Sequence, residues 1–286
     1  RVVGLNKEVD INSIDFGGPS PRWFRTTSFV DASLNDTKVY NFAVPSGVPD
    51  TLDSLRGSSG TTYAINSNVN IRLLHSNAEG KLTTEGALSK AYAICGNNDT
   101  FYFLLRDDVN FGKVENMKAV DTGVKVGAED VLYTYDRVRG VVSVPGNAGS
   151  EYLSSVESVS IVTDINELKN ATVSGESTNV LDYLNSKVDN KCTSLVEAKD
   201  AVNNSQGRYQ VVKIKTKEAF PQLLINLGAT QLGIVPKDVV SKVNEGITAE
   251  NYDPNKNTIY GDVSVMREGT GYNNNMWFSG PYVVTY

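Results

Sequence analysis

The stretch that decides the fold runs from residue 99 to residue 140 and reads DTFYFLLRDDVNFGKVENMKAVDTGVKVGAEDVLYTYDRVRG. Side chains alternate between two faces along a strand, and the apolar residues that open this stretch follow that pattern. Phe101, Phe103 and Leu105 fall on one face, and Tyr102 and Leu104 on the other. A charged turn and a second apolar pair, Val109 and Phe111, come next. The pattern predicts a strand, a loop and then a helix that packs back over the strand.

The helix is marked by its ends and by one apolar stripe. Acidic residues open it, arginines close it and Gly140 follows, which is the order that the helix dipole favours. Val131, Tyr135 and Val138 recur at helical spacing and predict a buried stripe. Tyr133 lies two positions from Tyr135 and cannot share that stripe. It therefore either faces a cleft or is one more packed aromatic side chain.

Both ends of this stretch resemble a family signature. YFLLRDDVNF (102–111) and GAEDVLYTYDRV (127–138) are similar to the motif of bacterial extracellular solute-binding proteins of family 5, the oligopeptide-binding components of ABC importers. The middle departs from the family, because GKVENMKAVDTGVK (112–125) stands where the family has a short turn.

Further patches resemble the same family in the same order. TKVYNFAV (37–44) and PSGVPDTLDSL (45–55) are similar to its opening strand and loop, although Ser54 replaces the usual proline. Residues 66–94 and 216–240 follow family patterns, the second with Pro236 at the start of a short helix. Gly280-Pro281-Tyr282 looks like the family's hinge strand. The order of these patches, more than any one of them, carries the resemblance.

The resemblance implies an α/β fold, a periplasmic-binding-protein-like (class II) lobe with a mixed sheet and an inserted smaller α/β subdomain. Residues 37–57 and 221–286 would form the core of a first lobe, and residues 58–220 the inserted subdomain. The segments 37–44 and 281–286 would share one sheet. Within the subdomain the pattern also predicts strands at 156–163 and 208–215 and a polar helical stretch over 179–204.

The leading segment, residues 1–36, has two interpretations. It is either a simple N-terminal extension or the equivalent of the family's C-terminal returning segment. In the second case it should pack on the same sheet as 37–44 and 281–286. Val2 to Leu5 is strand-like, and the pair Trp23-Phe24 is too apolar for a free tail.

Composition limits the classes of function. The 286 residues carry a net charge of −6 without a basic cluster, which argues against nucleic-acid binding. No apolar run is as long as a membrane span and no signal peptide is apparent, so we expect a mature or trimmed soluble piece. Cys95 and Cys192 lie far apart and predict two separate thiols, with one disulfide as the alternative.

Few residues suggest chemistry. The single histidine, His75, is expected at a helix end, where it would cap or lie at the surface. The adjacent acidic pairs at 107–108 and 129–130 read as solvated turn and helix-start charges. Residues 57–62 lack the lysine of a phosphate-binding loop and predict a helix cap. We therefore expect neither an enzyme nor a metal or other cofactor.

The resemblance also implies a site and a role. The family's ligand lies between two lobes, against the loop after the opening strand and an aromatic residue of the helix. Here these positions are Gly47, Val48 and Pro49, together with Tyr133, while Tyr282 lies at the hinge.

The implied role is capture of extracellular oligopeptides without chemistry, and their delivery to ABC transporter permease subunits. This would occur at the extracellular face of the cell membrane or in the periplasm, with any anchor, as in a lipoprotein, outside this chain. The alternative is an extracellular structural or adhesion domain without a small ligand.

Overall fold

The structure is a computed structural model. It describes residues 49, 51–77, 79–115, 118–262 and 276–284, together with the strands at 2–4, 7–9, 24–28 and 38–42. The chain divides into two compact units, residues 1–48 and residues 49–286, each of which is described by itself.

The helices are α1 (Gly60–Val69), α2 (Ala128–Val138), α3 (Ile165–Asn170), α4 (Val180–Asn185), α5 (Leu223–Asn226) and α6 (Lys237–Val243). The strands are β1 (Val2–Gly4), β2 (Lys7–Val9), β3 (Phe24–Ser28), β4 (Lys38–Phe42), β5 (His75–Ser76), β6 (Leu82–Thr83), β7 (Ser89–Cys95), β8 (Thr100–Leu105), β9 (Asn110–Glu115), β10 (Lys118–Lys125), β11 (Val156–Ile161), β12 (Ser194–Leu195), β13 (Arg208–Tyr209), β14 (Val211–Thr216) and β15 (Trp277–Phe278).

The first unit contains two antiparallel pairs, β1 with β2 and β3 with β4. Phe24 lies opposite Phe42 in the second pair. The leading segment therefore pairs with the opening strand, as expected if it belongs to the same sheet. Trp23, the ends of the 37–44 strand and residues 285–286 lie outside the described residues, and residues 281–284 form no strand that could join a shared sheet.

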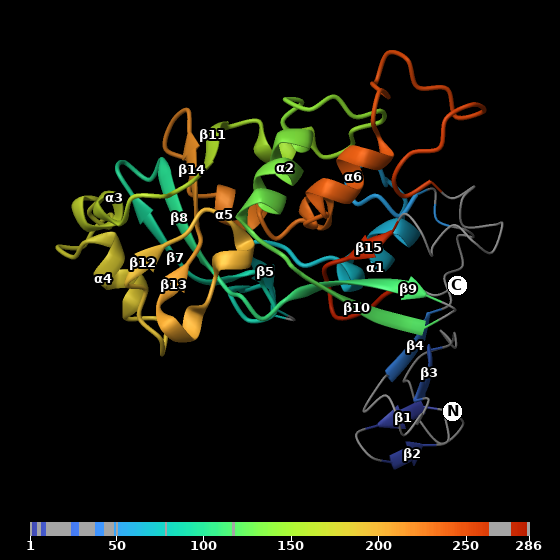
Figure 1. Cartoon of the computed structure of the whole chain (residues 1–286), viewed down its shortest axis with the longest axis horizontal. Helices are drawn as coiled ribbons and strands as arrows, with labels where there is room; N and C mark the ends of the chain where they lie inside the picture. The colour runs from blue at the N-terminus through green and yellow to red at the C-terminus, as the bar shows by residue number, and fades with distance from the viewer. Residues whose placement is uncertain are drawn as a thin grey trace. The chain divides into compact units, whose positions relative to one another are not determined.

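The second unit is built on a four-stranded sheet in the order β11-β14-β8-β7, with antiparallel neighbours. Figure 1 shows α2 on one side of this sheet and α3 and α4 on the other. Phe101, Phe103 and Leu105 join the core cluster that contains the stripe of α2, whereas Tyr102 and Leu104 join the cluster that includes Leu184 of α4. The alternation predicted for β8 and the α/β class are confirmed. The stripe of α2 is confirmed as well, since Val131, Tyr135 and Val138 are fully buried.

The insertion that departs from the family signature forms a hairpin. β9 and β10 pair antiparallel, and β15 adds to the other edge of β9, so that Trp277 lies opposite Lys113. The strand expected at 281–286 is wrong for residues 281–284, which form none. The strand lies earlier, at β15, because Gly280 turns its N–H to Val69 and Pro281 has no N–H to donate.

Two other expectations need correction. The helical stretch expected over 179–204 is an α-helix only in α4, because Asn185 bonds both the N–H and the carbonyl of Cys192 and turns the chain back. Helix α1 begins directly after its cap, Ser59, within the stretch where a cap was expected. It ends at Val69, before it reaches His75. His75 lies in β5 and not at a helix end, since the N–H groups of residues 88 and 89 bond the carbonyls of residues 72 and 73 and hold the chain extended.

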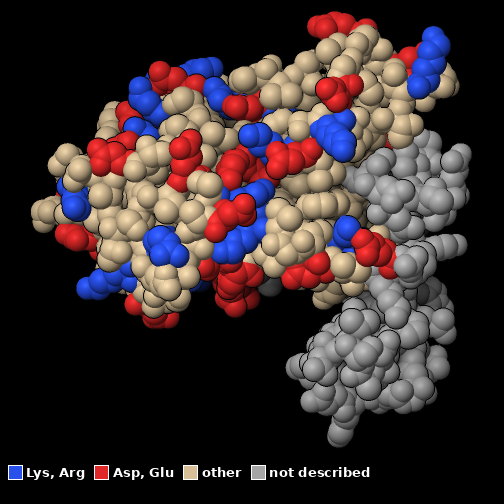
Figure 2. All heavy atoms as spheres, viewed as in Figure 1, with Lys and Arg blue, Asp and Glu red and all other residues tan. Residues whose placement is uncertain are grey.

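Charged side chains of both signs are intermixed on one face of the second unit. On the face shown in Figure 2, acidic and basic residues alternate over the described part of the chain. Among the described residues, no helix has the length and apolar character needed to cross a membrane.

Two buried tyrosines of the second unit differ in one hydrogen bond, which predicts opposite effects of removing the hydroxyl. The hydroxyl of Tyr135 is buried without a partner, whereas that of Tyr209 donates to the carbonyl of Asn190 at 2.6 Å. An unsatisfied buried hydroxyl costs about 1–3 kcal/mol. Tyr135→Phe should therefore raise the free energy of unfolding, and Tyr209→Phe should lower it by about 1 kcal/mol. Urea unfolding of both variants measures this. Destabilisation by Tyr135→Phe equal to that by Tyr209→Phe would contradict the assigned environments.

Both cysteines are free and buried in the same core cluster, which confirms two separate thiols. Burial raises the pKa of each thiol to about 11. The thiolate is the reactive form, so iodoacetamide at pH 8 should label neither cysteine in the folded protein and both after unfolding. Mass spectrometry before and after denaturation measures this, and rapid labelling of the native protein would show that a thiol reaches the surface.

Candidate functional site

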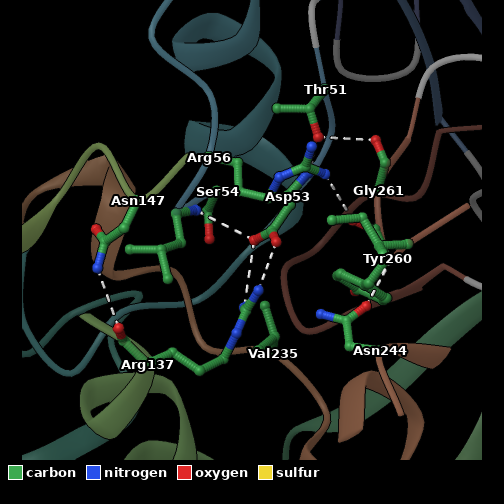
Figure 3. A network of polar contacts seen from close by, with 12 residues as sticks. Thr51, Asp53, Ser54, Arg56, Arg137, Asn147, Val235, Asn244, Tyr260 and Gly261 are labelled. Atoms are coloured by element: carbon green, nitrogen blue, oxygen red, sulfur yellow. Dashed lines mark hydrogen bonds and ion pairs between the residues drawn. The ribbon is translucent and has the colours of Figure 1, made fainter. Parts of the chain in front are cut away.

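Four stretches that lie far apart in the sequence meet in the second unit. They are residues 51–56, the helix α2, residues 233–237 and residues 276–280. We call this meeting point the junction. Figure 3 shows its polar contacts.

The centre of the junction is an ion pair between Asp53 and Arg137. Nη2 of Arg137 lies 2.5 Å from Oδ2 of Asp53, and Nη1 lies 3.3 Å from Oδ1. The two side chains are 0% and 1% exposed, so the pair is screened from water. Asp53 also accepts the N–H of Leu55, at 3.2 Å. This bidentate pair fixes the loop after the opening strand to the last turn of α2 (Figure 3).

The loop is held from its other side by residues 260–262. The hydroxyl of Thr51 donates to the carbonyl of Gly261 at 2.8 Å, and Nη1 of Arg56 pairs with Asp262 at 2.7 Å. Gly261 has φ of +81°, and a Cβ there would lie 2.3 Å from the backbone nitrogen of Asp53. Only glycine allows this approach, which places residue 261 directly against the ion pair.

The first half of α2 fixes the segment that leads into α6. Asp130 accepts the N–H of Lys237 at 2.9 Å and pairs with Lys199 at 2.8 Å, and Thr134 accepts the N–H of Val235 at 3.1 Å. Asp130 is fully buried, so the expectation of a solvated helix-start charge is wrong for it. Burial raises the pKa of Asp130, while Lys199 and the backbone N–H groups around the carboxylate act to lower it.

The hinge residues close the junction. Ser279 donates to the carbonyl of Ile234 at 2.6 Å and accepts the N–H of Ile71 at 3.1 Å. Gly280 donates to the carbonyl of Val69 at 2.8 Å, and a Cβ at residue 280 would lie 2.6 Å from the carbonyl carbon of that residue. The Gly-Pro-Tyr motif therefore has a physical reason for its glycine, namely close backbone contact with the end of α1.

An apolar cluster lies beside the ion pair and includes contacts from one predicted site residue, Tyr133. Its buried members are Leu52, Val69, Val235, Val240, Tyr260, Met276 and Phe278. Tyr133 packs against this cluster, as do Val283 and Val284 next to Tyr282. The pKa of Tyr133 is raised, mainly by burial; Arg137 acts to lower it and Asp53 to raise it. The ring of Tyr133 thus lies half-buried beside the charged centre of the junction.

The predicted site residues are placed as follows. Tyr133 is half-buried, Pro49 is half-buried at the start of the second unit, and Tyr282 is 38% exposed. Gly47 and Val48 lie outside the described residues. Asp53 and Arg137 were not predicted as part of the site. In the sequence Asp53 stands close to Leu52 and Leu55, and a charge near apolar residues is the signal that could have indicated its burial. Arg137 falls one residue from the buried stripe of α2.

The polar side chains at the centre of the junction bond to one another or to the backbone. Among the described residues, no group of three or more His, Cys, Asp or Glu side chains is placed to hold a metal ion. Both fully buried carboxylates of the junction are already engaged, Asp53 by Arg137 and Asp130 by Lys199. What the junction can provide is a rigid base with a half-buried tyrosine at its edge.

Comparison with known proteins gives matches among solved structures. No family model matches the chain, and no curated protein matches it. OppA of Burkholderia pseudomallei is 16% identical over 83% of this chain, with a TM-score of 0.46. A periplasmic oligopeptide-binding protein of Borrelia burgdorferi is 19% identical over 83%, with a TM-score of 0.45. The substrate-binding domain of an oligopeptide ABC transporter from Bacillus anthracis is 13% identical over 82%, with a TM-score of 0.47.

The match covers 34%, 35% and 33% of those three chains, so this chain spans about a third of their length.

The ion pair predicts a large and non-additive effect on stability. Arg137→Met or Asp53→Asn alone leaves a buried charge without its partner and should lower the free energy of unfolding by about 3–5 kcal/mol. The double variant should recover much of that loss, because neither charge remains. Urea unfolding of the two single variants and the double variant measures the coupling.

Arg139→Met is the matched control, since Arg139 lies on the same helical segment and its pair with Asp136 is partly exposed. That pair should contribute no more than about 1 kcal/mol. Equal losses for Arg137→Met and Arg139→Met, with no recovery in the double variant, would contradict a central role for the buried pair.

Proposed function

We propose that this chain is one lobe of the substrate-binding component of an ABC-type import system and captures extracellular oligopeptides without chemistry. The observation that carries the proposal is the convergence of the patches that resemble solute-binding proteins of family 5. The opening loop, the signature helix α2, the segment before α6 and the hinge bond to one another at the junction. Patches that matched the family only by their order along the chain are thus also neighbours in space.

The proposed ligand site takes the residues that the family resemblance implies. It consists of Gly47, Val48 and Pro49, which would offer backbone groups to an extended peptide, and of Tyr133 and Tyr282. Backbone pairing gives affinity without demanding one sequence, and a tyrosine ring adds an apolar face with a polar hydroxyl. The half-buried position of Tyr133 against the apolar cluster beside the ion pair supports this role, because its ring is held in place while part of it stays accessible.

The family resemblance also implies a partner, a location and a second lobe. The ligand would be handed to the permease subunits of the importer, in the periplasm or at the extracellular face of the membrane. A lipid anchor would hold the protein there. The remaining part of the cleft would come from a second lobe.

Peptide binding should depend on Tyr133. In the complete two-lobed protein, Tyr133→Ala should weaken the binding of mixed oligopeptides by about 1–3 kcal/mol if the ring is a central contact. Isothermal titration measures the affinity, and circular dichroism checks the fold. Because one lobe exposes only half a cleft, the 286-residue chain alone should bind the same peptides very weakly or not at all.

Tyr183→Ala is the matched control. Tyr183 is also half-buried, but it lies on α4 and packs against the core cluster that includes Leu184. Its replacement should leave peptide affinity unchanged. An unchanged affinity for a folded Tyr133→Ala variant would show that this ring only packs. If the complete wild-type protein gave no heat of binding with any oligopeptide, the structural or adhesion alternative would be favoured.

A further inference from the structure

Arg72 is a buried cation that has no acidic partner among the described residues. Its side chain belongs to the segment between α1 and β5, and the residue is only 8% exposed. Nη2 lies 2.7 Å from Nδ1 of His75, and Nε is buried without a hydrogen-bond partner. A buried guanidinium normally has its donors satisfied and its charge balanced, because leaving either unmet is costly.

The other described arginines of the second unit show what Arg72 lacks. Four of them pair with aspartates: Arg56 with Asp262, Arg106 with Asp108, Arg137 with Asp53 and Arg139 with Asp136. Arg208 is partly exposed and donates to a backbone carbonyl. Within the described part of the chain, no carboxylate forms a salt bridge with Arg72. Burial lowers the pKa of Arg72 and is the sole cause of that shift, which agrees with the absence of an acid beside it.

The one partner of the guanidinium, His75, brings no negative charge. A guanidinium only donates hydrogen bonds, so Nδ1 of His75 must accept, and the ring proton lies on Nε2 of a neutral imidazole. Burial, and then the charge of Arg72, lower the pKa of His75, which favours this neutral form. The pair therefore carries one net positive charge and at least one unused buried donor.

The pair lies close to the surface of the second unit. His75 is half-buried, and the next two residues along the chain, Ser76 and Asn77, are exposed. An exposed turn joins β5 to β6, closed by a hydrogen bond from Gly80 to Asn77. His75 is therefore the more exposed member of the pair, and this turn is the side from which we expect a small ion to reach it.

We propose that Arg72 and His75 form a binding site for a small oxyanion, a carboxylate or a phosphate, separate from the proposed peptide site. The anion would pair with the guanidinium and accept its unused N–H groups. Two parallel bonds from a guanidinium match the geometry of both oxyanions. The proposal does not depend on the proposed peptide-binding function, because it rests only on residues 72 and 75.

The single histidine makes the site measurable without a functional assay. The ring protons of His75 give one set of histidine signals in the NMR spectrum of the 286-residue chain. Sodium acetate and sodium phosphate, each added at constant ionic strength against sodium chloride, should shift these signals in a saturable way. A bound anion favours the protonated ring, so the pKa of His75 should rise by about one unit. Saturation by acetate alone identifies a carboxylate site, and saturation by phosphate alone a phosphate site; either supports the proposal.

Variants separate specific binding from general screening. Arg72→Met should abolish the response while leaving the protein folded, because it removes an unpaired buried charge. Arg72→Gln serves the same purpose if the methionine variant does not fold. Arg106→Met is the matched control, since Arg106 is already paired with Asp108, and it should respond like the wild type. A response to neither anion, a response equal to that of chloride, or one that persists without Arg72 would overturn the proposal.

Discussion

The buried pair between Asp53 and Arg137 is the constraint on which the second unit depends. A charge without solvent must keep its partner, so the loop that carries Asp53 and the helix that carries Arg137 cannot separate without a large loss of stability. Gly261 packs against the backbone of the loop at a distance that no side chain would allow. The pair thus sets the relative position of segments that are 84 residues apart in the sequence.

The constraint also acts on the surroundings of Tyr133. Tyr133 lies one helical turn before Arg137, and its ring rests on the apolar cluster that also receives the hinge residues. A ring held in this way loses little conformational entropy when it contacts a ligand. The junction thus holds the ring of Tyr133 on a fixed base, which agrees with the peptide site that we propose.

The local elements could be predicted from the sequence because their signals are local. The two-faced alternation of β8, the stripe of α2 and the cap at Ser59 each follow from residue spacing, and the structure has them where the spacing puts them. The missed features are long-range. Burial of Asp130, the turn at Asn185 and the strand at Trp277 depend on partners distant in sequence or on side-chain bonds to the backbone. The spacing of residues along the chain does not predict such contacts. It likewise does not predict that Arg72 is buried beside His75.

The most direct measurement of the central claim is a crystal structure of the complete protein grown with a mixture of oligopeptides. The account predicts an extended peptide whose main chain runs beside residues 47–49 and whose side chain contacts the ring of Tyr133, with the pair of Asp53 and Arg137 intact beneath it. A peptide bound elsewhere, or a ring of Tyr133 fully covered by the protein's own chain, would contradict the account.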